Sequence, residues 1–113
     1  MLQIYSVVLE VASQLRPIID RIERHDRSLA IQLRRALSSV ALNTSEGAGS
    51  QGRNRRARYF NALGSQKETR ACLDVATALG YIAPIDHGLD DKLDHITAVL
   101  WRVSHARTCA ARS

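Results

Sequence analysis

Apolar residues recur every three or four positions through most of the chain, which is the spacing of amphipathic helices. The first such stretch runs from Leu2 to about Glu23. Its apolar stripe consists of Ile4, Val8, Val11, Leu15, Ile18 or Ile19, and Ile22. Pro17 falls inside this stretch, and a proline within a helix removes one backbone hydrogen bond. We therefore expect the first helix to be either bent at Pro17 or split into two shorter pieces.

A second helix is expected from a cap at Ser28 to about Glu46. Its apolar positions are Leu29, Leu33, Ala36 or Leu37, Val40 and Thr44. Three glycines follow within residues 47–52, and each would destabilise a helix interior by about 1 kcal/mol relative to alanine. The helix should therefore stop here, and a flexible connection should follow.

A third helix is expected from about Asn54 to Leu79. Gly80 as a left-handed cap and Pro84 shortly beyond it are typical stop signals. A fourth helix is expected from about Leu89, with its apolar stripe at Leu89, Leu93, Ile96, Leu100 and Val103. Acids near its start and arginines near its end complement the helix dipole; these are Asp86, Asp90, Asp91, Arg102 and Arg107.

Four amphipathic helices joined by short loops predict one all-α domain over residues 1–113, an up-down-up-down antiparallel four-helix bundle. The composition agrees with this, because aromatic residues make up only 4% of the chain and sheets prefer aromatic and β-branched residues. Cys72 and Cys109 lie apart on apolar stretches, so we expect reduced thiols and neither a disulfide nor a zinc site. From the apolar pattern we expect neither a signal peptide nor a transmembrane segment. We expect a cytoplasmic protein without a membrane partner or a cofactor.

The chain is basic, with sixteen Lys and Arg against eleven Asp and Glu, and a pI near 9.9. All but Lys67 and Lys92 of these cations are arginine, which binds phosphate bidentately and favours a nucleic-acid partner. A GC-rich genome would give the same bias. The segment from Arg16 to Arg70 holds twelve cations and five anions, so a polyanion site should lie in the first two thirds of the chain.

Four arginines cluster at the expected start of the third helix, beside the aromatic residues Tyr59 and Phe60; they are Arg53, Arg55, Arg56 and Arg58. Helices normally carry acids at this end, where the dipole is positive. Arginines and free backbone amides at a helix start are typical of a phosphate-binding edge. Lys67 and Arg70 can extend this contact. A solvated helix start is the alternative interpretation.

Catalytic chemistry finds little support. The glycine-rich residues 47–52 follow a helix and lack the G-K-[ST] of a phosphate-binding loop. Glu46 and Glu68 are expected to be buried and paired with arginine rather than to act as an acid and a base. We therefore do not expect an enzyme.

Metal binding also finds little support. His87, Asp91 and His95 have the four-residue spacing of metal ligands on a helix but lack a third strong ligand, so we expect no metal. Trp101 and Tyr5 either join the core or protrude into a subunit contact, and small residues on the helices leave room for an oligomer.

Several motifs of the central segment agree at once with one family. They are Gln32-Leu33-Arg34-Arg35-Ala36, Ser39-Val40, Asn43 with Glu46-Gly47 and Gly49, Ala62-Leu63-Gly64-Ser65 with Glu68, Leu73, Ala76, and Leu79-Gly80-Tyr81-Ile82. Over about residues 28–82 the chain resembles the bacterial four helix bundle protein family. That family was named for proteins encoded in intervening sequences of large-subunit ribosomal RNA genes. It includes the accessory variability determinants of diversity-generating retroelements.

The resemblance implies a bundle that assembles into a ring-like homopentamer. It also implies a basic surface that, in the retroelement members, binds nucleic acid and a partner reverse transcriptase. By motif position, packing and hydrogen bonds between the second and third helices fall to Asn43, Glu46, Gly64, Ser65 and Glu68. Arg34 and Arg35 would pair with these acids or line the assembly. The chain departs from the family pattern at Gln66 and Thr69, which are polar, and at Pro17.

Two hypotheses about function follow. The first is a non-enzymatic, oligomeric accessory protein that binds RNA or DNA through the arginines of residues 53–58, with Lys67 and Arg70, and that assists a reverse transcriptase. The alternative is a protein-protein adaptor whose basic edge docks an acidic partner, without physiological binding of nucleic acid.

Overall fold

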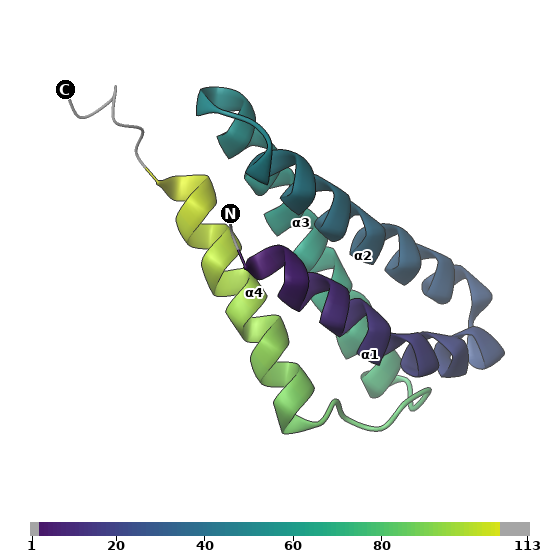
Figure 1. The fold of residues 1–113 in the computed structure, drawn as a ribbon. Helices are drawn as coiled ribbons and strands as arrows, with labels where there is room; N and C mark the ends of the chain where they lie inside the picture. Colours follow the sequence, from purple (N-terminus) through teal and green to yellow (C-terminus); the bar gives the residue numbers. More distant parts are fainter. Residues whose placement is uncertain (1–2, 107–113) are drawn as a thin grey trace.

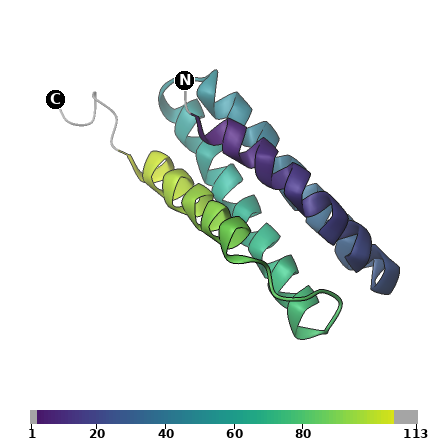
Figure 2. The same cartoon turned by 60° about the horizontal axis from the view of Figure 1, so that its bottom comes forward.

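The computed structural model describes residues 3–106, which form four helices: α1 (Ile4–His25), α2 (Arg27–Ala48), α3 (Gly52–Ala78) and α4 (His87–His105). Successive helices run in opposite directions (Figures 1 and 2), in an elongated bundle of 52 × 25 × 20 Å. The α2–α3 interface is the most extensive and the α1–α4 interface the smallest. The described residues contain no strand. The predicted all-α up-down-up-down bundle is confirmed.

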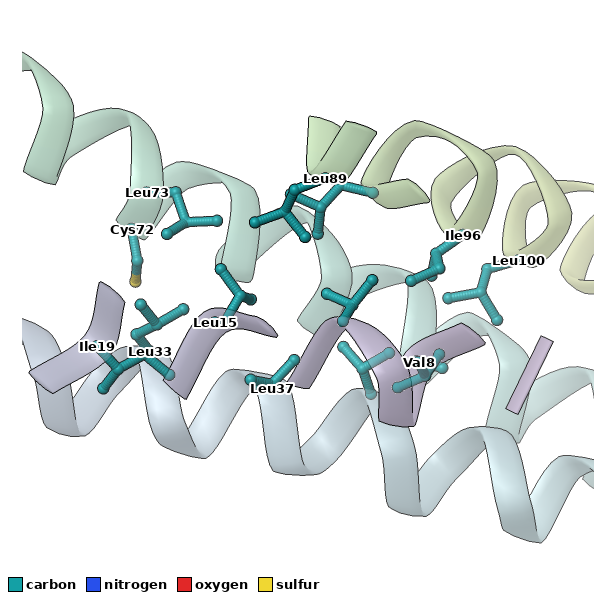
Figure 3. Close-up of a cluster of buried hydrophobic side chains, with 14 of the residues drawn as sticks. Val8, Leu15, Ile19, Leu33, Leu37, Cys72, Leu73, Leu89, Ile96 and Leu100 are labelled. Atoms are coloured by element: carbon teal, nitrogen blue, oxygen red, sulfur yellow. The ribbon is translucent and has the colours of Figure 1, made fainter. Parts of the chain in front are cut away.

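The core is built from the apolar stripe of every helix (Figure 3). Side chains from all four helices point into one shared interior, among them Val8 and Leu15 of α1, Leu33 of α2, Leu73 of α3, and Ile96 of α4. Burying each such side chain contributes roughly 1.5–3 kcal/mol. This shared core fixes the rotation of each helix and thereby decides which polar side chains face solvent.

Pro17 lies inside α1 without splitting it, because the helix runs unbroken from Ile4 to His25. The proline itself is exposed, while Leu15 and Ile19 on either side of it are buried. A backbone carbonyl that loses its partner on a solvent-facing side can bond to water instead. The helix therefore keeps one continuous buried stripe, and a division into two pieces is wrong.

Aspartates cap two of the helices, and one of these caps differs from the prediction. The N-cap of α2 is Asp26 and not Ser28, because the Leu29 amide donates to Asp26 Oδ1 at 3.0 Å. Asp86 caps α4 in the same way, accepting from the Leu89 amide at 3.3 Å. A carboxylate at these positions also complements the positive end of the helix dipole.

The end of α3 follows the predicted signals. Gly80 has φ +77°, a conformation that glycine adopts without strain. Its amide donates to Thr77 O, and the Tyr81 amide donates to Ala76 O at 2.9 Å. This is a Schellman ending, and Gly80 is its left-handed residue.

The two polar departures from the family pattern are both buried, and both are hydrogen-bonded. Gln66 is 1% exposed, and its Nε2 donates to Leu93 O at 3.2 Å, which joins α3 to α4. Thr69 Oγ1 donates to Ser65 O at 2.9 Å. Satisfied groups of this kind are tolerated in a core, so the packing is kept.

Cys72 is a free thiol buried in the core, as the sequence indicated, and Cys109 lies outside the described residues. Burial raises the pKa of Cys72, and the negative charge of Glu68 raises it further. None of the described helices has the length and hydropathy needed to cross a membrane.

Candidate nucleic-acid interface

The N-terminal end of α3 carries positive charge that nothing neutralises within the helix itself. Gln51, the N-cap residue, makes no side-chain capping bond, and the first turn contains no acid. The first amides of a helix have no partner within the helix, and they sit at the positive end of its dipole. Arginines here therefore add to a field that already attracts anions.

The four arginines of this end are not equivalent. Arg58 Nε lies 3.0 Å from Glu46 Oε2, an ion pair between α3 and α2. Arg55 Nε donates to Ser50 O at 2.9 Å, which ties it to the α2–α3 connection. Arg53 and Arg56 have no ion-pair partner among residues 3–106. The charges of these two guanidinium groups are therefore not compensated by a neighbouring carboxylate within this range; Arg53 is exposed and Arg56 is half-buried.

Lys67 and Arg70, the two candidates farther along α3, are placed differently. Lys67 is exposed. Arg70 is only 28% exposed in its side chain, with Nη2 lying 3.1 Å from Asp90 Oδ1 and Nη1 lying 3.1 Å from Asp94 Oδ1. Arg70 thus holds α3 against α4, and much of its charge is already satisfied.

Arg34, expected near Glu46 and Glu68, instead joins α1 to α2. Its Nη2 lies 2.6 Å from Glu23 Oε1 and 3.3 Å from Asp20 Oδ1. Glu46 is 55% exposed in its side chain, and Glu68 is also exposed. The expectation that these two carboxylates are buried is therefore wrong, because the core determines a rotation that turns both to solvent.

Three of the motif polar residues do meet between α2 and α3. Ser65 Oγ donates to Ser39 Oγ at 2.7 Å, and Asn43 Nδ2 donates to both Ser39 O and Ser39 Oγ at 3.0 Å. Gly64 takes no part in this contact, because it is exposed and a Cβ there would meet nothing within 4 Å. Arg35 lies beside this seam, where it lines a surface depression of about 500 Å³ together with Ser38 and Leu42.

An aromatic cluster at the same end of the bundle was not anticipated. Trp101 and His105 of α4 stack with ring centroids 4.2 Å apart, and Phe60 of α3 lies 5.0 Å from His105. The antiparallel pairing of α3 and α4 brings the start of one helix to the end of the other (Figure 1). The positions of these residues in the sequence do indicate the cluster. Phe60 lies near the start of α3, and Trp101 and His105 lie near the end of α4, the two ends that antiparallel packing brings together.

Further arginines gather at the opposite end, around the junction of α1 and α2, where Arg21, Arg24 and Arg27 are exposed. Asp20 and Glu23 lie in the same region, so this end is of mixed charge. His87, Asp91 and His95 do not come together, because residues 3–106 contain no group of three or more His, Cys, Asp or Glu placed to hold a metal.

The family model of the 23S rRNA-intervening sequence protein matches residues 1–102, which is most of the chain. The chain belongs to this family. The match extends the motif resemblance of residues 28–82 to both terminal helices.

A solved structure shows the same fold. It is a protein of unknown function from the S23 ribosomal protein family of Bacteroides thetaiotaomicron VPI-5482, and it aligns with a TM-score of 0.79 at 18% identity. The alignment covers 91% of this chain and 99% of the other. No curated protein matches the sequence. The likeness therefore supports the four-helix architecture of this chain.

Proposed function

We propose that this member of the family is a non-enzymatic, RNA-binding protein that contacts phosphates with the N-terminal end of α3. The observation that carries the proposal is the start of this helix, which has no capping side chain and no acid, and where Arg53 and Arg56 lack ion-pair partners among the described residues. The family's link to ribosomal RNA genes supports RNA as the ligand. DNA, which offers the same phosphates, is the competing ligand.

Binding of this kind positions the backbone of the ligand and does not read its sequence. It releases counterions, so affinity falls steeply as salt rises. We therefore expect little sequence preference and strong salt dependence.

We also propose that the protein forms a homo-oligomer, a pentamer by the resemblance. Two large apolar side chains on different helices support an assembly, since Leu42 of α2 is 64% exposed and Leu79 at the end of α3 is 58% exposed. An oligomer would repeat the basic end of the bundle in each copy and raise avidity for a long strand. Light scattering of the purified protein measures this directly, and a monomer at micromolar concentration would contradict it. The resemblance also implies a reverse transcriptase as a partner. This stays a prediction, which co-purification with the protein would test.

The decisive experiment compares two variants that lose the same charge at opposite ends of the bundle. One is Arg53→Ala with Arg55→Ala and Arg56→Ala, which keeps the ion pair of Arg58. The matched control is Arg21→Ala with Arg24→Ala and Arg27→Ala. Fluorescence anisotropy with a labelled RNA of about 20 nucleotides, titrated over about 50–200 mM salt, gives affinity and salt slope.

We expect the first variant to bind more weakly and with a shallower slope, by about 0.7 for each phosphate of a single strand that the protein no longer neutralises. The control should retain most of its affinity. Equal reductions in the two variants would show that only net charge matters and would contradict the site. Absence of RNA binding at physiological salt, with a protein partner that co-purifies, would instead favour the adaptor hypothesis.

A further inference from the structure

The aromatic cluster beside the basic end of α3 is exposed, although large aromatic rings usually lie in the core. Trp101 is 52% exposed and Phe60 is 46% exposed. His105 is exposed as well, yet it is held in place: its Nδ1 lies 2.8 Å from Trp101 O and 3.1 Å from Ser104 Oγ. The three rings therefore form an ordered surface.

Among the residues that the structure describes, one ring stacks on the Trp101 indole: that of His105, from one turn later in α4 and with an interplanar angle of 17°. On the N-terminal side the surface is hollowed, over a volume of about 750 Å³. Trp101, Arg102 and the preceding residues Asp94, Thr97 and Ala98 line this hollow. Ala98 is small, so a flat ring can approach the indole here.

The charges around the platform suit a polyanion. Arg56 lies four residues before Phe60 and Arg53 lies seven before it, spacings that place all three on one face of α3. Arg102 lies next to Trp101 on α4. The carboxylate of Asp94, also in the hollow, is paired with Arg70 at 3.1 Å.

A ligand that follows this face would meet phosphate-binding groups first and flat aromatic rings next. Single-stranded nucleic acid has this composition, because its backbone is anionic and its unpaired bases stack on aromatic side chains. In a duplex the bases are already stacked on each other and cannot reach the rings. A second copy of the chain fits less well in a two-fold contact, since Arg53, Arg56 and Arg102 of one copy would face the same arginines of the other.

We propose that Phe60, Trp101 and His105 form a stacking platform for unpaired bases, so that the protein prefers single-stranded RNA to duplex RNA. This inference rests on the proposed function, because the arginines of α3 hold the backbone of the same strand. The stacking adds the preference for strand over duplex, which phosphate contacts alone would not give.

Trp101 is the single tryptophan of the chain, so its fluorescence reports on the platform directly. Three probes separate stacking from charge: a uridine oligonucleotide of about twelve residues, an RNA duplex of the same length, and inorganic polyphosphate, which has charge but no bases. We expect the single strand to quench the fluorescence strongly and to bind at least tenfold more tightly than the duplex. Polyphosphate should bind through the arginines and quench little.

Substitutions then test the rings. Trp101→Leu and Phe60→Leu keep apolar side chains at exposed sites and should each weaken single-strand binding roughly tenfold or more, with duplex binding unchanged. Tyr81→Leu is the matched control, because Tyr81 stacks on His25 with centroids 5.1 Å apart at the other end of the bundle. Circular dichroism checks that every variant is folded.

The outcomes separate this inference from the proposed function. Binding of strand, duplex and polyphosphate with equal affinity, abolished on removing the arginines and unaffected by Trp101→Leu, would overturn the platform and leave RNA binding intact. Binding of none of the three probes would overturn both. A change of oligomeric state in Trp101→Leu, with affinity per subunit unchanged, would assign this face to a subunit contact and overturn the platform.

Discussion

The ring of Tyr59 fills the space that a side chain at residue 47 would need: a Cβ on Gly47 would lie 2.5 Å from Tyr59 Cε1 and 2.8 Å from Cδ1. Tyr59 is 2% exposed and Gly47 is buried. The last turn of α2 can therefore lie close to α3 just below the basic end. Glycine at 47 is a packing requirement, since its backbone is helical.

This relationship predicts opposite effects of one substitution at two glycines. Gly47→Ala should lower the free energy of unfolding by roughly 1–3 kcal/mol, because the ring of Tyr59 must move. Gly64→Ala should raise it by about 0.5–1 kcal/mol, because residue 64 is exposed in a helix and alanine loses less backbone entropy on folding than glycine does. Urea denaturation followed by circular dichroism measures both. Destabilisation by Gly64→Ala would show that residue 64 packs against something outside the protomer.

The cap of α2 gives a second prediction. Asp26→Ala removes the carboxylate that accepts from the Leu29 amide and should destabilise the protein by about 1 kcal/mol. Ser28→Ala, which lies within the first turn, should change stability by less than about 0.5 kcal/mol. Thermal unfolding distinguishes them, with Tm about 5 °C lower expected for Asp26→Ala. Equal shifts would contradict the assignment of the cap.

Substitutions of Lys67 and Arg70 should have different effects, the first on RNA binding and the second on the stability of the fold. Arg70→Met breaks the contacts with Asp90 and Asp94 and should destabilise the fold by about 1 kcal/mol, since the arginine is largely covered and both acids are partly exposed. It should leave the salt slope of RNA binding nearly unchanged. Lys67→Gln should instead leave the stability of the fold unchanged and make the salt slope shallower, by up to about 0.7. A much shallower salt slope in Arg70→Met would show that Arg70 contacts the RNA after all.

Alkaline pH should lower the stability of the fold through two buried groups, the phenol of Tyr59 and the thiol of Cys72. Burial raises the pKa of Tyr59, against a smaller opposing effect of Arg55, and burial followed by the charge of Glu68 raises the pKa of Cys72. Both groups thus keep their protons in the folded protein at a pH where the unfolded chain has lost them. Stability then falls as pH rises, from about pH 8.5 for the thiol and about pH 10 for the phenol.

Urea unfolding at a series of pH values between about 8 and 10.5 tests this. Cys72→Ala with Tyr59→Phe should flatten the decline, even if the variant is less stable overall. A decline of the same steepness in the double variant would assign it to other groups.

The helices were predictable because burial selects residues by local spacing. Ile4, Val8 and Val11 share a stripe whatever α1 packs against, and Gly80 ends α3 through a backbone conformation of its own. The cap at Asp26 was misassigned to Ser28, two residues along, because both side chains can accept the bond and only the backbone geometry selects one.

Contacts between helices were less predictable. Arg34 was expected beside the glutamates of α2 and α3, yet its partners are on α1, because helix rotation is set by the whole core. For the same reason the pairing of Arg70 with acids of α4 could not be inferred from the charge pattern of α3. The cluster of arginines at residues 53–58 was visible as a local run, whereas the rings of Phe60 and His105 meet only once two distant segments fold together.

The small interface between α1 and α4 is the seam at which the bundle closes. Within the described residues, the ion pair of Lys92 Nζ with Glu10 Oε2 at 2.9 Å crosses it, and exposed pairs of this kind stabilise little. Once this seam opens, α4 is held by α3 alone, whereas α3 keeps its extensive interface with α2, so amide hydrogens of α4 should exchange faster than those of α3. A strand held by arginines of α3 and by Trp101 of α4 would add a contact between these two helices. Occupancy of the surface would then slow the opening of α4, and the kinetic lifetime of the closed bundle would depend on its ligand.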